Sequence, residues 1–333
     1  MEKMPENEKK LVMGTSPHIA SKSSTPQIMV EVCIALFPAL VAGVLFFGFY
    51  SLLVVALSIA TCVLFEFLFN LIRKRPQTIN DFSAVVTGLI LGLTLPPAVP
   101  VYVPIVGGIF AIVIVKMLFG GLGKNFANPA ATARIFLVLA WTSIMSSYIP
   151  SVISSGNLFS FAVQSGTTPS TGATPLASGE ADLLKLFLGN TAGCIGETSA
   201  LALIIGGAYL IVRKIIDWRI PLALILSFGL FTLIFKQDIF AVLPGILSGG
   251  VVFVSFFMAT DYSTSPNTKI GRIIFAALIG FLNAFLRQFS AMTEGISFAI
   301  ILANLVVPLI DKWIIPKPFG YVKLKKQKNV EEK

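Results

Sequence analysis

Long, nearly uninterrupted apolar runs constrain this chain more than any other feature. Segments such as "IMVEVCIALFPALVAGVLFFGFY" and "VVFVSFFMAT" lack the alternation of apolar and polar positions that the helices and strands of a water-soluble fold require. The whole chain is 55% hydrophobic and only 12% charged, and it contains 28 Phe. These features predict an all-α integral membrane protein.

Apolar stretches of roughly 17 to 23 residues are the expected length for membrane-spanning helices. By this criterion we predict ten spans, at 28–49, 51–71, 82–97, 102–119, 131–149, 197–212, 218–235, 239–258, 271–287 and 294–311. The predicted organisation is a polar N-terminal arm, a first half of five helices, a long loop, a second half of five helices and a basic tail, at 1–27, 28–149, 150–196, 197–311 and 312–333.

The positions of the basic residues predict the orientation. Of the 25 Lys and Arg, 21 lie in the N-terminal arm, around the even-numbered connections, or in the C-terminal tail, all on one side of a ten-span protein. Lys124 and Arg134, near spans four and five, are counted in this group. The positive-inside rule therefore predicts that both termini are cytoplasmic and that the loop 150–196 is extracytoplasmic. The N-terminal arm carries no early apolar core, so we expect no cleaved signal peptide.

Five spans in each half would invert the second half relative to the first, as in many transporters. Each half has a Gly-rich span followed by a polar, Pro-containing break, with "NFANPA" in the first half and "TDYSTSP" in the second. Such breaks either line a cavity or are ordinary turns between helices.

Charges inside predicted spans are costly unless they are paired, neutralised or solvated. Glu66 and Lys116 lie deep enough to pair across helices, whereas Glu31 and Glu197 lie near helix starts, where they could reach water or cap a helix. The alternative is a role in ion or proton movement. The residues that we select for an ion path or a second cofactor site are Glu66, Lys116, Glu197, Asn125, Asn128 and Asp261.

Known catalytic motifs do not account for this chain. It has no Walker sequence, no dinucleotide-binding glycine loop and no H-E-x-x-H, and its only histidine, His18, lies in the N-terminal arm. Cys33, Cys62 and Cys194 are far apart, so we interpret them as inert thiols and predict no metal site. The basic charge follows membrane topology and does not indicate nucleic-acid binding.

The loop segment "SGTTPSTGATP", residues 165–175, combines six hydroxyl side chains with Gly, Ala and Pro. Its composition suits either a spacer or an exposed segment that a modifying enzyme can bind.

Several motifs together resemble one family. "STGATPLA" is similar to the S-G-A-T motif of the NqrB/RnfD family of membrane flavoproteins, whose members belong to the sodium-pumping NADH:quinone reductase and to the Rnf complex. Other segments, before and after it, resemble further motifs of the family in the same order along the chain, namely "AVVTGLILGLTLPP", "GGLGKNFANPA", "GNTAGCIGETSALALIIGG", "TDYSTSPNTKIGR" and "EGISFAIILANLVVPLIDKW". The short N-terminal arm and "SPHI" favour the RnfD branch of this family.

The resemblance implies a function that the residues alone do not specify. It implies that Thr174 carries FMN through a phosphoester, with Gly172 and Ala173 leaving room beside it, and that a second, noncovalent flavin such as riboflavin binds near the cytoplasmic side. It implies a subunit of an ion-translocating ferredoxin:NAD oxidoreductase in the prokaryotic plasma membrane, with other Rnf-type subunits and a flavin transferase as partners. Thr168 stands where family members often have an acidic residue.

Two other functions fit the same helices. A non-redox channel or secondary transporter would also use inverted halves and broken spans, and a scaffold protein would leave the loop unmodified. The sequence does not distinguish Na⁺ from H⁺ as the coupled ion.

Overall fold

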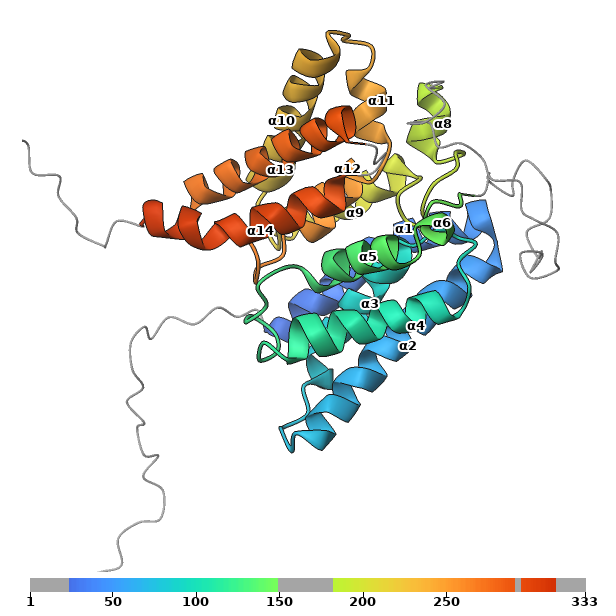
Figure 1. Cartoon of the computed structure of the whole chain (residues 1–333), viewed down its shortest axis with the longest axis vertical. Helices are drawn as coiled ribbons and strands as arrows, with labels where there is room; N and C mark the ends of the chain where they lie inside the picture. Colours follow the sequence, from blue (N-terminus) through green and yellow to red (C-terminus); the bar gives the residue numbers. More distant parts are fainter. Residues whose placement is uncertain (1–23, 149–181, 291–294, 316–333) are drawn as a thin grey trace, which may run out of the picture.

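The computed structural model describes residues 24–148, 182–290 and 295–315, and every regular element within them is a helix (Figure 1). The first group, coloured blue to green in Figure 1, consists of α1 (Thr25–Phe47), α2 (Phe49–Ile72), η1 (Ile79–Asp81), α3 (Ser83–Leu93), α4 (Tyr102–Ile109), η2 (Phe110–Met117), α5 (Pro129–Ala140) and α6 (Thr142–Met145). The second group consists of α8 (Leu183–Leu188), α9 (Ala200–Val212), α10 (Arg219–Lys236), α11 (Val242–Leu247), α12 (Val251–Phe253), η5 (Val254–Met258), α13 (Lys269–Phe289) and α14 (Ile296–Trp313).

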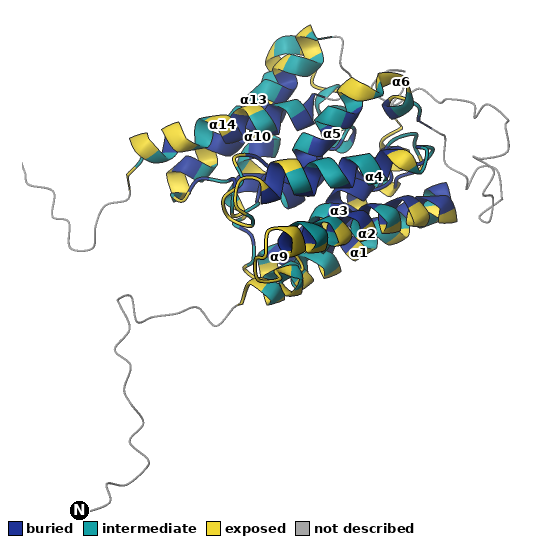
Figure 2. Ribbon diagram, turned by 60° about the horizontal axis from the view of Figure 1, so that its bottom comes forward, coloured by how far each residue is buried: buried dark blue, intermediate teal, exposed yellow. Residues whose placement is uncertain are grey.

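Each group packs mainly on itself and meets the other through a few helices. In the first group α2 packs on α3 and α4, and in the second α10 packs on α13. Between the groups, α1 contacts α9 and α5 contacts α14 (Figure 1). The buried residues lie on the faces that the helices turn toward one another, whereas many outward side chains are large and apolar (Figure 2). Such an outer surface suits a lipid environment.

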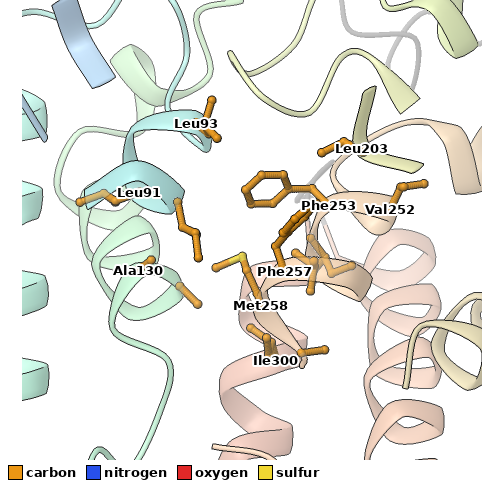
Figure 3. Packing of buried hydrophobic residues seen from close by; sticks show 14 of the residues in the cluster. Leu91, Leu93, Ala130, Leu203, Val252, Phe253, Phe257, Met258 and Ile300 are labelled. Atoms are coloured by element: carbon orange, nitrogen blue, oxygen red, sulfur yellow. The ribbon is translucent and has the colours of Figure 1, made fainter. Parts of the chain in front are cut away.

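The centre of the molecule is an apolar contact between the two groups. Leu91, Leu93 and Ala130 of the first group lie opposite Phe253, Phe257 and Met258 of the second, all at most 5% exposed (Figure 3).

Five described helices, α1, α2, α10, α13 and α14, are long and apolar enough to cross a membrane. Apolar helices of 10–17 residues lie at Ser83–Leu93, Tyr102–Met117, Pro129–Ala140 and Ala200–Val212. The prediction of an all-helical protein with membrane-spanning helices is confirmed to this extent.

Three predicted spans are cut short or interrupted in the structure, namely 82–97, 131–149 and 239–258. The span predicted at 82–97 stops at Leu93, because Pro96 and Pro97 cannot continue the hydrogen-bonded ladder. The span predicted at 131–149 is interrupted after Ala140, and a short helix follows at Thr142. These breaks shorten the helices without changing their order.

The span predicted at 239–258 is broken in its middle, so the prediction of one continuous helix there was wrong. Gly249 and Gly250 adopt φ values of 65° and 73°, which end α11 and restart the chain as α12. This left-handed backbone is accessible to glycine at little cost. The predicted loop 150–196 also contains α8 within its described part.

Candidate functional site

The non-helical segment that precedes α9 meets the C-terminal end of α3 between the helix groups. The segment just before α9 donates backbone hydrogen bonds to the end of α3, from Ile195 N to Leu95 O at 3.0 Å and from Gly196 N to Leu93 O at 2.8 Å. Non-helical backbone at this depth is tolerated when its polar groups are paired within the protein.

A buried ion pair joins this segment to α5. Arg134 Nη1 donates to Glu197 Oε1, and Arg134 Nη2 lies 3.3 Å from Cys194 Sγ. Arg134 is 3% exposed and Glu197 is 6% exposed. A Cβ placed on Gly250 would lie 2.7 Å from Glu197 Oε1, so the broken span lies directly against the carboxylate.

The broken span is held from the other side by Arg287 of α13. Its Nη1 donates to Gly245 O at 2.8 Å, and its Nη2 donates to Ser248 O at 3.1 Å and Gly249 O at 2.8 Å. The guanidinium also lies 4.9 Å from the ring centroid of Phe228. The carbonyl groups freed at the end of α11 are therefore satisfied by a cation.

A second buried ion pair lies within the first group. Lys116 Nζ donates to Glu66 Oε2 and to Ser83 Oγ, each at 2.6 Å. Glu66 Oε1 accepts from Thr78 Oγ1 at 2.6 Å. Lys116 is 1% exposed and Glu66 is 0% exposed, so this charge is buried but paired.

Lys116 lies in η2, where the backbone is a π-helix. Segments of this type are rare in α-helices and often occur at functional sites.

A cavity of about 80 Å³ lies beside Lys116 and between the two helix groups. The "NFANPA" segment contributes Asn125 and Asn128 to its wall, and the "TDYSTSP" segment contributes Asp261, Tyr262 and Ser263. Its remaining wall is largely apolar and comes from α1, α3, α9 and η5, with Met29, Val86, Ile90, Leu210, Phe256 and Phe257 among its residues.

Among the residues that the structure describes, one buried polar atom of the cavity wall lacks a hydrogen-bond partner. Asn125 Oδ1 is buried and accepts no hydrogen bond, although it belongs to a residue of the wall. Such an atom is costly to bury alone and would accept a hydrogen bond from a bound N–H group.

Asn304 of α14 connects the two segments. With its amide oriented to pair both atoms, it donates to Thr264 O at 3.2 Å and accepts from Asn128 N at 3.1 Å. Asn128 itself caps α5, because its Oδ1 accepts from Ala130 N at 3.1 Å and Ala131 N at 3.2 Å. The cavity wall is thus built from both halves, and Asn304 joins its two polar segments by hydrogen bonds.

Asp261 ends the polar side of this wall. Its carboxylate accepts from Ser263 Oγ at 2.8 Å and from Thr264 Oγ1 at 3.2 Å. Burial raises the pKa of the Asp261 carboxyl above its ordinary value, and these hydrogen bonds oppose that shift only in part.

The structure decides among the alternatives for the residues selected from sequence. Glu66 and Lys116 do meet, as the prediction of a pair across helices required. Glu197 is buried and pairs with Arg134, whereas Glu31 contacts Tyr209 and the exposed Arg213 near the surface. Asn125, Asn128 and Asp261 share one cavity, so the two breaks line a cavity and are not ordinary turns.

Some residues of the site were missed, and others lie elsewhere. Arg134 was counted only among the basic residues of the cytoplasmic side, although it lies inside the predicted span 131–149 and, in the structure, inside α5. Asn304 and Arg287 lie in spans where no sequence pattern distinguishes them. The signal that could have identified Arg134 is its position inside an apolar span, where a charge is costly unless it is paired. Gly172, Ala173 and Thr174 lie outside the described residues. Among the described residues, no group of three or more His, Cys, Asp or Glu side chains could hold a metal ion.

Comparison of the sequence with known proteins identifies its family. A sequence model of the NQR2, RnfD, RnfE family matches residues 12–320. The chain is 43% identical over 332 residues, 96% of this chain and 99% of the other, to the D subunit of the Na⁺-translocating ferredoxin:NAD⁺ oxidoreductase complex of Acetobacterium woodii. It is 39% identical to the D subunit of the proton-translocating ferredoxin:NAD⁺ oxidoreductase complex of Clostridium ljungdahlii, over 92% of this chain and 96% of the other.

A more distant relative also matches over most of the length of both chains. The D subunit of the ion-translocating oxidoreductase complex of Actinobacillus succinogenes is 35% identical, over 93% of this chain and 98% of the other. The chain therefore belongs to the NQR2, RnfD, RnfE family.

Proposed function

We propose that this chain is the RnfD component of an Rnf-type complex that transfers electrons between reduced ferredoxin and NAD⁺ and couples this transfer to ion transport. The observation that carries the proposal is the 43% identity, over nearly the full length of both chains, to the corresponding component of a ferredoxin:NAD⁺ oxidoreductase complex. One relative is named for Na⁺ and another for protons, and the complex formed by this chain uses one of these two ions.

The first part of the proposal concerns the loop. The hydroxyl of Thr174 forms a phosphoester with FMN through a flavin transferase, and the small neighbours Gly172 and Ala173 leave space for the phosphate. The motif "STGATPLA" supports this assignment, because it is similar to the flavin attachment motif of the family. The flavin supplies the redox chemistry, and the chain supplies its position.

The second part concerns the cavity, which we assign to a noncovalent flavin such as riboflavin. The apolar walls and the buried Asn125 Oδ1, which accepts no hydrogen bond from the described residues, suit a planar ring that carries N–H donors at its edge. Asn125, Asn128 and Asp261 would hold its polar edge, and Phe256 and Phe257 belong to the apolar wall.

The third part concerns topology: ten spans form two inverted halves in the plasma membrane, with both termini in the cytoplasm and the flavin loop outside. Corresponding features of the two halves support this. Lys116 near the end of the fourth span binds Ser83 at the start of the third, and Arg287 near the end of the ninth binds the backbone just before α12 in the eighth. The contacts of α1 with α9 and of α5 with α14 also relate equivalent helices. Fusing a reporter that is active only outside the cytoplasm to the loop and to the tail tests the orientation, because only the loop fusion should be active.

In-gel flavin fluorescence tests the attachment site. The chain is co-expressed with a flavin transferase and run on a denaturing gel, where a fluorescent band is expected for the parent and for Thr171→Val. Thr174→Val should lose the band while accumulating to the same level. A band that persists in Thr174→Val moves the attachment to another hydroxyl, and its absence from the parent removes the covalent flavin.

Acid-extractable flavin tests the cavity. The purified complex should release a noncovalent flavin, and Asn125→Leu should release much less while its covalent fluorescence is unchanged. Lys124→Gln, next in sequence but outside the cavity wall, is the matched control. Ion flux in liposomes without any electron donor would instead support a channel or secondary transporter.

A further inference from the structure

A continuous hydrogen-bonded chain runs from the α2–α3 connection to the cavity. Ser83 Oγ donates to Asp81 Oδ1 at 2.5 Å, and Lys116 Nζ donates to Ser83 Oγ at 2.6 Å. Ser83 and Lys116 both line the cavity. Asp81 is half-buried, and the preceding residues 73–78 are exposed. The chain therefore connects a carboxylate beside an exposed loop to a buried ammonium group.

We propose that Asp81, Ser83 and Lys116 form a proton relay that delivers protons from the aqueous edge of the protein to the ligand in the cavity. This inference rests on the proposed noncovalent flavin there, because reduction of such a ring requires protons as well as electrons. The electrons come from the low-potential donor of the complex, which the relatives' names give as ferredoxin.

The geometry allows Lys116 to donate into the cavity. An ammonium group has three N–H donors, and Glu66 and Ser83 account for two of them. Glu66 also provides the negative charge that makes a buried ammonium tolerable. A third N–H bond on a residue of the cavity wall is the expected position for a donor to a bound acceptor atom.

The proton balance is simple. A Lys116 N–H bond breaks as its proton moves to an acceptor atom of the reduced ligand. The Ser83 hydroxyl, which donates to Asp81 in the resting state, then rotates toward the neutral Nζ and gives its proton to that nitrogen. The Asp81 carboxyl, protonated from water, passes its proton to Ser83 Oγ. Each proton delivered to the cavity is thus replaced by one from bulk water, and the three side chains return to their starting states.

Other titratable groups surround Lys116. Glu66 faces it from α2, Cys62 lies on the same helix face near Gly108, and Asp261 lines the same cavity from the connection after η5. Asp81 differs from these groups because it lies next to the exposed loop, and its Oδ1 accepts from the hydroxyl to which Lys116 donates.

The decisive variant is Asp81→Asn. The amide oxygen can still accept from Ser83 N, which lies 2.8 Å from Asp81 Oδ1 in the parent, and from Ser83 Oγ. The turn is therefore retained while the exchangeable carboxyl proton is lost. Ser83→Ala breaks the relay, and Ser83→Thr keeps its hydroxyl. Asp182→Asn changes an exposed carboxylate at the start of α8 that has no contact with the cavity and serves as the control.

The assay is proton uptake by the intact complex, followed with a pH indicator in stopped flow after reduction, with the flavin content of each variant measured first. We expect Asp81→Asn and Ser83→Ala to slow uptake at least about tenfold. Ser83→Thr and Asp182→Asn should retain the parent rate. Formate or another small weak acid should restore the rate of Asp81→Asn, which a purely structural defect would not allow.

Infrared difference spectra supply a second readout. A protonated-carboxyl band should appear transiently on reduction and be absent in Asp81→Asn. Unchanged uptake in Asp81→Asn, or slow uptake that no weak acid rescues, would overturn the relay while leaving the flavin assignment intact. A parent complex without acid-extractable flavin would overturn the flavin assignment, and with it the relay.

Discussion

The Arg134–Glu197 ion pair should be the most sensitive point of the interface between the two helix groups. Both side chains are 4% exposed, and they join α5 to the segment before α9. Glu197→Ala leaves the Arg134 guanidinium buried without this carboxylate, and breaking a buried pair from one side typically costs about 3–5 kcal/mol. Replacing both residues by apolar side chains of similar volume, as in Arg134→Met with Glu197→Leu, should recover most of that loss, because no uncompensated charge remains.

Thermal unfolding of the purified chain in detergent measures these changes. A loss of this size corresponds to a fall of about 6–15 °C in Tm if each kcal/mol shifts Tm by about 2–3 °C. The matched control is Asp182→Ala, which breaks the exposed Lys185–Asp182 pair, with side chains 62% and 52% exposed, and should cost less than about 1 kcal/mol. If Glu197→Ala unfolds within about 2 °C of the parent, less than the shift expected for 1 kcal/mol, or if the double variant is no more stable than Glu197→Ala, the reasoning is refuted.

Three further predictions concern the broken span and the cavity. Gly250→Ala should lower Tm more than Gly121→Ala: both have positive φ, but only at Gly250 would the new Cβ meet Glu197 Oε1, whereas at Gly121 nothing lies within 4 Å. Asn304→Leu should reduce the acid-extractable flavin without reducing covalent fluorescence, because it removes the bridge between the two segments, and equal retention of both flavins would contradict this. Because the pKa of Asp261 is raised in the folded protein, its folded state binds the proton more tightly, so its contribution to stability is present at low pH and is lost as pH rises from about 3.8 through the raised value. Tm measured against pH should therefore show a smaller decline over this range in Asp261→Asn than in the parent.

The apolar runs by themselves determined the helical class and the order of the helices. A segment such as 25–47 has no other stable solution in a bilayer, where every backbone polar group must be paired within the segment. The clustering of small and polar residues beside Pro in "NFANPA" and "TDYSTSP" also marked the two segments that line the cavity.

Only the tertiary structure decided how the charges are paired. Glu66 and Lys116 are 50 residues apart, and Arg134 and Glu197 are 63 residues apart, so no local pattern relates them. The positive-inside count grouped Arg134 with the cytoplasmic basic residues, yet the helix that Asn128 caps carries it into the interior. The break at Gly249 and Gly250 likewise depends on Arg287, a distant residue that binds the freed carbonyl groups. Hydropathy predicts which segments leave water, but the cost of burying each charge is met by a partner that only the packing of helices brings within reach.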